Sequence, residues 1–195
     1  MQETFSLTEM YFWRDALTDN SSLVITGQGL WGRGTPRRTE QMIEELLGQE
    51  TRNVKIHILA YVFSKYSNNM IELIEGCLGR NCTIKMIVND LYKKEEPLNA
   101  VDELERLNKT YDNFHLASFD KDENAMLHAK VIVVNRKKAL VGSANISFNA
   151  MNKNYEIGLY IHDGDHPPTL ALMIDDLMEN NSLCTIVKKP ENDNK

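Results

Sequence analysis

The chain has 195 residues, of which 42% are hydrophobic and 26% charged, and its formal net charge is −6 at pH 7. This composition is ordinary for a soluble globular protein and argues against a protein that coats polyanions generally, while leaving room for a local basic cleft. No apolar run approaches the roughly 20 residues of a membrane helix. The N-terminus lacks the basic start and apolar core of a secretory signal. The three cysteines show no metal or disulfide spacing, which is typical of reduced thiols in a cytoplasmic protein.

The first elements are predicted from apolar spacing. Residues 7–18 should form an amphipathic helix, because a capping-box pattern at Ser6 to Glu9 precedes apolar residues at helical intervals. Residues 23–25 are a candidate short strand, and residues 42–47 should form a helix that ends near Gly48.

A glycine-rich stretch, residues 27–38, lies between that strand and that helix. It lacks the Gly-Lys-Ser/Thr ending of a phosphate-binding P-loop. Arg33, Arg37 and Arg38 could line the path of an anionic substrate by contacting phosphates, and Trp31 could stack on a base. The alternative is a flexible surface loop without a binding role, and both interpretations stay open.

Strands and helices alternate from residue 54 to residue 119. Strands are expected at residues 54–63, 82–88 and 114–119, and helices at residues 70–78 and from Pro97 to about Leu107. The histidines within these strands, His57 and His115, are interpreted as structural. The alternation is typical of an α/β fold in which helices sandwich a mixed, mostly parallel sheet.

Polar candidates for chemistry begin at His128. His128 and Lys130 are two residues apart, so on an extended strand their side chains face the same side. Four apolar residues, 131–134, follow, and Asn135 then opens a polar turn. The run is therefore predicted to be the first strand of a hairpin, with the two polar side chains at its start.

The second strand of that hairpin brings further polar groups back. Residues 139–141 are apolar and lead into Gly142-Ser143-Ala144-Asn145. Antiparallel pairing would place Ser143 and Asn145 beside the His-x-Lys pair. Glu156 opens another apolar run, so a carboxylate can reach the same spot. An incidental histidine in a buried hairpin is the plainer alternative.

These residues together resemble the signature of the phospholipase D superfamily, which is His-x-Lys, four residues, Asp, six residues, Gly-Ser-x-Asn and a later Asn-x-Glu. The spacing holds throughout this chain, with one departure: Asn135 stands where the family usually has Asp. Asn135 is expected in the turn at the far end of the strand, so we interpret it, like Gly142, as structural. Residues 35–63 also loosely resemble phospholipase-D-like proteins of bacterial restriction and phage-defence systems.

The resemblance implies a metal-independent phosphodiesterase that uses no cofactor. His128 would attack phosphorus and form a covalent phosphohistidine, and Glu156 would orient the imidazole by accepting a hydrogen bond. Lys130 and Asn145 would hold the non-bridging phosphate oxygens, with Ser143 assisting. A homodimer that shares one site between two motifs is expected, because in-line displacement needs an acid opposite the nucleophile.

The substrate is left more open by the sequence. A nuclease acting on DNA or RNA is favoured, because small single-motif relatives are commonly nucleases and the chain carries the arginines described above. The alternatives are a phospholipase D acting on lipid and a non-cleaving nucleic-acid-binding subunit of a defence complex. An additional protein partner could supply specificity.

The remaining segments are interpreted as scaffold. The acidic stretch 120–124 and the His/Asp-rich stretch 162–168 are predicted to be exposed turns rather than metal sites. A long helix is expected over residues 170–178 and an edge strand over 183–187. Residues 1–187 should form one phospholipase D-like domain, and residues 188–195 a flexible tail.

Overall fold

The computed structural model describes residues 20–27, 37–64, 68–93, 100–122 and 124–189. Within these residues one sheet contains eight strands, namely β1 (Ser21–Thr26), β2 (Lys55–Ala60), β3 (Thr83–Asn89), β4 (Phe114–Phe119), β5 (Val131–Val134), β6 (Lys138–Gly142), β7 (Glu156–His162) and β8 (Cys184–Ile186). The helices of the same residues are α2 (Thr39–Leu47), α3 (Asn68–Gly79), α4 (Val101–Thr110), α5 (Phe148–Asn152) and α6 (His166–Glu179).

The strand order across the sheet is β1-β7-β6-β5-β2-β3-β4-β8. β2, β3 and β4 pair in parallel, because α3 and α4 carry the chain back between them. The other pairings are antiparallel. The α/β fold with a mixed sheet between helices is therefore as predicted. The parallel part is smaller than expected, since β5 enters antiparallel beside β2 and both edge strands, β1 and β8, also pair antiparallel with their neighbours.

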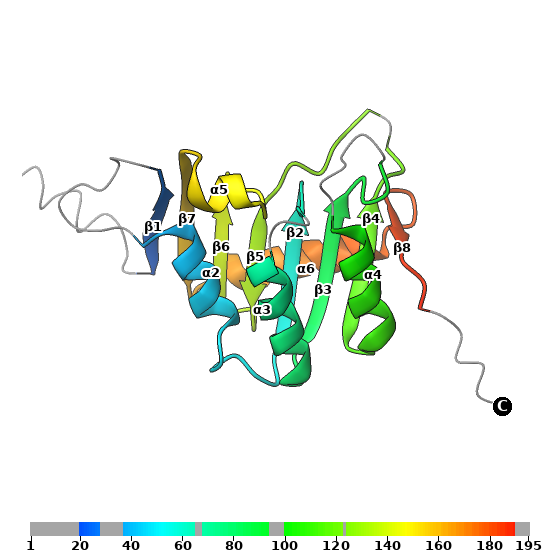
Figure 1. Cartoon of the computed structure of the whole chain (residues 1–195), viewed down its shortest axis with the longest axis horizontal. Helices are drawn as coiled ribbons and strands as arrows, with labels where there is room; N and C mark the ends of the chain where they lie inside the picture. The colour runs from blue at the N-terminus through cyan, green and yellow to red at the C-terminus, as the bar shows by residue number, and fades with distance from the viewer. Residues whose placement is uncertain (1–19, 28–36, 65–67, 94–99, 123, 190–195) are drawn as a thin grey trace, which may run out of the picture.

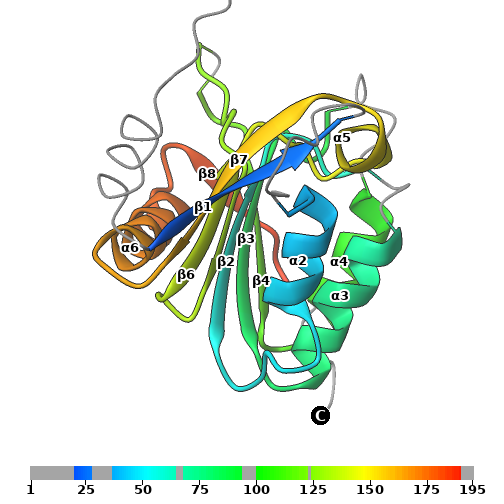
Figure 2. The ribbon, with the colours of Figure 1, turned by 90° about the vertical axis from the view of Figure 1, so that its left-hand side faces the viewer.

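Helices cover both faces of the sheet. Figure 1 shows α2, α3 and α4 in front of the strands and α6 behind them, and Figure 2 shows the same layers edge-on. The larger apolar core lies under α2, α3 and α4, and the smaller one lies under α6. The short helix α5 lies at one end of the sheet, beside the ends of β6 and β7 (Figure 1).

The strand β5 shows why the His-x-Lys pair is held firmly. All four of its residues are buried, as expected for a β-branched run that is covered on both faces. Ile132 and Val134 pack into the larger core, and Val131 and Val133 into the smaller one. Because neither face of the strand is open to solvent, its register is strongly specified, and so is the position of the residues that precede it.

Several predicted elements agree with the structure and two differ. The predicted helix over residues 7–18 lies outside the described residues, as do most of the glycine-rich stretch and the end of the tail. The helix α5 was not expected. The stretch predicted as an exposed turn ends early, because α6 begins at His166 with Pro167 and Pro168 in its first turn. Proline is favoured there, since the first helical N–H groups need no partner within the helix.

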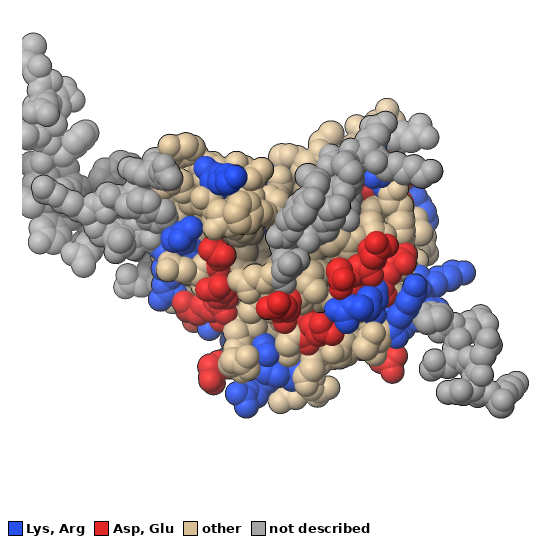
Figure 3. All heavy atoms as spheres, viewed as in Figure 1, with Lys and Arg blue, Asp and Glu red and all other residues tan. Residues whose placement is uncertain are grey.

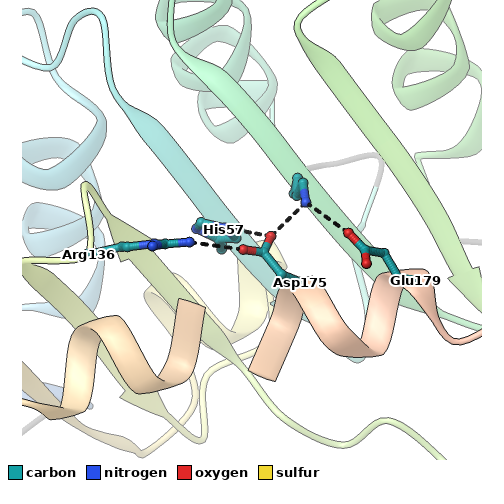
Figure 4. A network of polar contacts seen from close by, with 5 residues as sticks. His57, Arg136, Asp175 and Glu179 are labelled. Atoms are coloured by element: carbon teal, nitrogen blue, oxygen red, sulfur yellow. Dashed lines mark hydrogen bonds and ion pairs between the residues drawn. The ribbon is translucent and has the colours of Figure 1, made fainter. Parts of the chain in front are cut away.

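A polar network joins the sheet to α6, at the end of β5 away from Lys130. Asp175 of α6 contacts His57 Nε2 at 3.1 Å, accepts a hydrogen bond from Lys85 Nζ at 2.7 Å, and pairs with Arg136 at 3.3 Å (Figure 4). Burial lowers the pKa of His57, and the nearby Asp175 carboxylate partly offsets this effect. The expected structural role of His57 fits this position, since it fastens β2 to α6.

Candidate active site

His128 and Lys130 lie immediately before β5, at the end of the sheet that carries α5. The regular strand begins one residue after Lys130. The main-chain oxygen of Lys130 still accepts a hydrogen bond from the Gly142 N–H at 3.1 Å, so the hairpin ladder extends to the pair. His128 is exposed, whereas only 9% of Lys130 is accessible. An accessible imidazole thus stands beside a shielded ammonium group.

The Lys130 ammonium lies against His128. Its Nζ is 3.0 Å from Nδ1, 3.2 Å from Nε2 and 2.7 Å from the main-chain oxygen of His128. Burial lowers the pKa of Lys130, and the Glu156 carboxylate partly offsets this effect. A desolvated cation attracts a phosphate oxygen more strongly than an exposed one, because the local dielectric constant is lower.

Tyr61 is a third member of this group that the sequence did not indicate. Its ring centroid is 4.5 Å from that of His128 at an interplanar angle of 53°, and Lys130 Nζ is 5.1 Å from the Tyr61 ring centroid. Tyr61 follows the last residue of β2, whose carboxyl end lies beside a parallel neighbour. In open α/β sheets, ligand sites gather outside such ends, which is the signal that could have drawn attention to it.

Glu156 and Ser143 form a second pair at the same end of the sheet. Ser143 Oγ donates a hydrogen bond to Glu156 Oε2, and Asn154 Nδ2 donates to Glu156 Oε1 at 3.1 Å. The Ile157 N–H donates to Ser143 Oγ at 3.2 Å. Glu156 is buried, so these donors offset the desolvation of its charge.

The expected hydrogen bond between Glu156 and His128 is therefore not formed in the described part of the chain. Glu156 uses its two oxygens on Ser143 and Asn154, while His128 contacts Lys130 and Tyr61. The Glu156 carboxylate is connected to this site by its hydrogen bond from Ser143 and by its charge near Lys130, and not by a direct contact with the imidazole.

Gly142 is required by the close approach of two strands. A Cβ atom at this position would lie 3.0 Å from the Gly158 Cα and 3.1 Å from the Ile157 oxygen. Both contacts are with backbone, which cannot move aside cheaply. The glycine thus lets β6 and β7 approach where Ser143 meets Glu156.

Asn145 lies between β6 and α5. Its side-chain oxygen is buried and has no hydrogen-bond partner among the described residues. Its main-chain oxygen accepts from the Ser147 N–H at 2.9 Å, and Ser147 caps α5 by accepting from the Ala150 N–H at 3.3 Å. A buried amide oxygen without a partner is rare and marks a position to be explained by function.

Asn135 lies where the sequence placed it, in the turn between β5 and β6. Asn135 and Arg136 have φ angles of 55° and 54°, which is the left-handed conformation of a type I′ hairpin turn. Asparagine tolerates this conformation better than most residues. The residue stands at the opposite end of β5 from Lys130.

The predicted substrate-binding residues are only partly described. Arg33 and Trp31 lie outside the described residues. Arg37 pairs with Glu45 and borders an open cleft together with Lys138 and His162, at the ends of β6 and β7 away from the motif. Arg38 precedes α2, and its backbone N–H donates to the Gln41 side chain at 3.2 Å.

No cluster of three or more His, Cys, Asp or Glu side chains suited to a metal occurs among the residues with described positions. The His/Asp-rich stretch before α6 accordingly brings no such cluster together. In that same part of the chain, no helix has the length and apolar character needed to span a membrane.

The fold and this site define the class of protein. The family model described as "Cardiolipin synthase, PLD-like domain" matches residues 40–179. The chain therefore belongs to the phospholipase D-like (PLD-like) domain family, as the motif predicted. Members of this superfamily are phosphodiesterases, and the match includes every motif residue from His128 to Glu156.

Individual proteins show the same relationship. Similar structures include the phospholipase D family member Nuc from Salmonella typhimurium, with a TM-score of 0.64, 14% identity, and coverage of 87% of this chain and 99% of Nuc. NucT from Helicobacter pylori has a TM-score of 0.63 and 18% identity, covering 85% of this chain and 98% of NucT. At these identities the likeness concerns the fold.

A larger enzyme contains the same fold as one part. Phosphatidylserine synthase from Haemophilus influenzae Rd KW20 has a TM-score of 0.62 and 19% identity, covering 87% of this chain and 40% of the synthase. In sequence, the DISARM protein DrmC of Bacillus paralicheniformis is 42% identical over 55 residues, which are 28% of this chain and 22% of DrmC.

Proposed function

We propose that the chain is a metal-independent phosphodiesterase, most specifically a nuclease that cleaves DNA or RNA through a covalent phosphohistidine at His128. The observation that carries the proposal is the placement of an exposed imidazole against the shielded ammonium of Lys130, beside the Ser143–Glu156 pair. These groups supply a nucleophile and donors for phosphate oxygens at one accessible spot.

The reaction has two displacement steps. The neutral His128 imidazole attacks phosphorus, a P–N bond forms, and the bond to the leaving oxygen breaks as that oxygen takes a proton from an acid. Water then attacks the same phosphorus, giving its proton to the now neutral acid, and the P–N bond breaks. Attacking and leaving groups lie in line on opposite sides of phosphorus in each step.

The neighbouring side chains stabilise the charge that develops on the phosphate. Lys130 contacts one non-bridging oxygen and the amide N–H of Asn145 donates a hydrogen bond to the other, while Ser143, whose single O–H donates to Glu156, assists by keeping that carboxylate near Lys130. Glu156 holds the Ser143 hydroxyl in place and supports the charged form of Lys130. Tyr61 restricts the imidazole to one face of the site.

The acid comes from a second copy of the chain. One motif supplies one histidine, which cannot attack and protonate from opposite sides in the same step. A two-fold homodimer would place a second His128 across the phosphate. The partner histidine starts protonated, gives its proton to the leaving oxygen, and takes one from water in the second step.

A nucleic acid is the substrate we favour over a lipid. The similarity to DrmC, a protein named for the DISARM system, supports a role in defence, and an additional protein partner could direct specificity. The similarity to a phosphatidylserine synthase keeps lipid as the competing substrate.

The test uses the purified chain with labelled single-stranded DNA, duplex DNA, RNA and phosphatidylglycerol vesicles, all in excess chelator. Cleavage of a nucleic acid is expected, with a phosphohistidine adduct on His128 in rapidly quenched reactions. The His128→Ala chain, purified identically, controls for contaminating nucleases. Activity that disappears in chelator and returns with Mg²⁺, or an adduct on another residue, would contradict the mechanism.

A further inference from the structure

A cavity of about 230 Å³ lies between α2, α3 and α5, next to the candidate active site. Its wall includes Ile43 and Ile146, which also line the small space beneath Lys130. Ile146 follows Asn145 directly in the chain. The cavity thus adjoins the space that Lys130 lines, and the reaction itself does not use it.

The floor and one side of the cavity are apolar and aromatic. Met70 and Leu73 of α3 and Met151 of α5 contribute aliphatic surface, and Phe148 of α5 supplies a ring that is 50% exposed. Lys153 Nζ lies 5.4 Å from the Phe148 ring centroid. An exposed aromatic face beside a cation is the combination with which proteins bind unpaired bases, by stacking on the base and contacting its phosphate.

The rim is polar and negatively charged. Glu40 and Glu44 of α2, Asn69 of α3 and Asn152 of α5 surround the opening, and Asn69 Nδ2 donates to Glu44 Oε1 at 3.0 Å. Carboxylates repel a phosphate but accept hydrogen bonds from the amino group of cytosine, adenine or guanine. The rim therefore suits the edge of a base rather than the backbone that carries it.

Size and charge argue against other occupants. The cavity is smaller than the about 300–1,000 Å³ that drug-sized ligands occupy, so it fits a single ring system. Figure 3 shows acidic side chains interspersed with basic ones across α2, α3 and α4, whereas basic and uncharged atoms cover the region of α5. A nucleic-acid backbone would therefore approach over α5, which places its bases at the mouth of the cavity.

We infer that this cavity binds one unpaired, amino-bearing base of the substrate, next to the phosphate that is cleaved. The inference rests on the proposed nuclease function and specifies its substrate as a single strand. A base in a regular duplex cannot enter unless it leaves the stack, which adds an unfavourable unpairing step. Single strands are accordingly bound and cleaved in preference to duplexes of the same sequence.

The test measures binding to the His128→Ala chain, which is expected to bind without cleaving. The probes are a fluorescein-labelled single strand, its duplex, and single strands with one abasic site moved along the sequence. The single strand should bind at least about tenfold more tightly than the duplex. One abasic position near the scissile phosphate should weaken binding of the single strand by about tenfold as well. Phe148→Ala should weaken binding of the intact strand similarly, while Phe148→Tyr retains it.

The decisive measurement combines the Phe148→Ala substitution with the abasic site and compares the losses of binding affinity. In the Phe148→Ala chain, the abasic site at the sensitive position should have little further effect, because ring and base form one contact. Leu172→Ala, which truncates an equally exposed apolar residue on α6, is the matched control and should change nothing. The inference would be overturned if the losses of binding free energy from Phe148→Ala and from the abasic site were additive, or if the single strand and the duplex bound with equal affinity.

The outcomes also separate this inference from the proposed function. If the chain cleaves nucleic acids in chelator but the abasic site does not change the binding affinity, the chain is a nuclease and its cavity does not bind a base. A chain that cleaves only phosphatidylglycerol vesicles, with Phe148→Ala lowering that activity, has an acyl chain in the cavity, and both proposals are then wrong. Folding of each variant is checked by its urea unfolding midpoint.

Discussion

Lys130 Nζ donates a hydrogen bond to the main-chain oxygen of His128 at 2.7 Å. The cation is therefore held by the backbone of the same residue whose imidazole ring it contacts. This contact does not depend on the protonation state of the imidazole. The ammonium group therefore keeps its place when His128 is neutral, protonated or bonded to phosphorus. It is a preorganised donor, and preorganisation is what makes such groups effective in a transition state.

Lys130→Gln is accordingly expected to lower kcat by about 10²–10³, the usual effect of losing one such donor. Substrate affinity should fall less, because the interaction strengthens as charge develops. Lys138→Gln is the matched control, since Lys138 is exposed at the other end of β6. Steady-state kinetics on a labelled oligonucleotide measure both values. A variant that raises KM without lowering kcat would show that Lys130 only binds substrate.

Asn135 should matter for stability and not for turnover. Asn135→Val places a β-branched residue at φ 55° and should destabilise the fold by about 1–2 kcal/mol, whereas Asn135→Gly should be tolerated. Urea unfolding measures the stabilities, and kcat should stay near that of the parent chain in both variants. Asn135→Gly with normal stability and a large loss in kcat would place this residue in the reaction.

The contrast between Asn135 and Glu156 shows what the sequence could predict. The turn at Asn135 follows from local rules, since a polar residue between two apolar runs favours a hairpin. The positions of most strands and helices along the chain were predictable for the same reason. The partners of Glu156 were not, because Ser143, Asn154 and His128 are all candidate donors in the sequence and only the packed backbone decides which of them reach the carboxylate.

Three other features could not be predicted from the sequence, each for a physical reason. The helix α5 is short and mostly exposed, so it carries no apolar periodicity to detect. Tyr61 belongs to no motif, and its contact with His128 joins segments that are distant in the chain. The smaller share of parallel pairing likewise depends on β5 entering beside β2, which neither strand specifies alone.

Tyr61 is expected to act through His128 as a positioning residue. Tyr61→Phe keeps the ring that packs on the imidazole and should retain most of kcat, whereas Tyr61→Ala should lower it by about tenfold through looser alignment. The NMR signal of the His128 Hε1 proton gives an independent readout, since loss of the neighbouring ring removes its ring-current shift. An unchanged Hε1 signal in the Tyr61→Ala chain would contradict the contact.

Asp175 should couple fold stability to pH. Burial raises the pKa of Asp175, but Lys85 and His57 outweigh this effect and hold that pKa below its ordinary value. Asp175 thus contributes stability above its unfolded pKa of about 4, and this contribution is lost as the pH falls through the folded value. His57, whose pKa is also lowered, acts in the same direction below about pH 6.5.

Asp175→Asn is therefore expected to lower the free energy of unfolding by about 1.5–3 kcal/mol at neutral pH, the range for hydrogen bonds to charged groups. The difference between parent and variant should shrink as the pH falls from about 4 toward the lower folded pKa of Asp175, because the unfolded carboxylate takes up its proton first. Urea unfolding over a pH series measures this. Asp176→Asn, on the exposed side of the same helix, is the control. A difference that is constant with pH would mean that packing and not charge is lost.

The shared active site has a sharper test in mixed dimers. Parent chains are refolded together with His128→Ala chains in varying proportions, so that subunits pair at random. A mixed dimer has one His128 and lacks the acid opposite it, so only parent dimers complete the reaction. Activity per total protein should then fall as the square of the parent fraction. At equal mixing roughly a quarter of the activity should remain, instead of the half expected for self-sufficient chains.

Native mass spectrometry confirms that mixed dimers form, and Lys138→Gln chains mixed in the same way should leave activity unchanged. A linear fall with mixed dimers present would rule out sharing and would require an acid within one chain. The histidines of β2 and β4 are poor substitutes for that acid. His57 is buried against α6 and bonded to Asp175, and His115 pairs in register with Lys85 on that same face of the sheet. Because both histidines lie away from Lys130, we expect activity to fall as the square of the parent fraction.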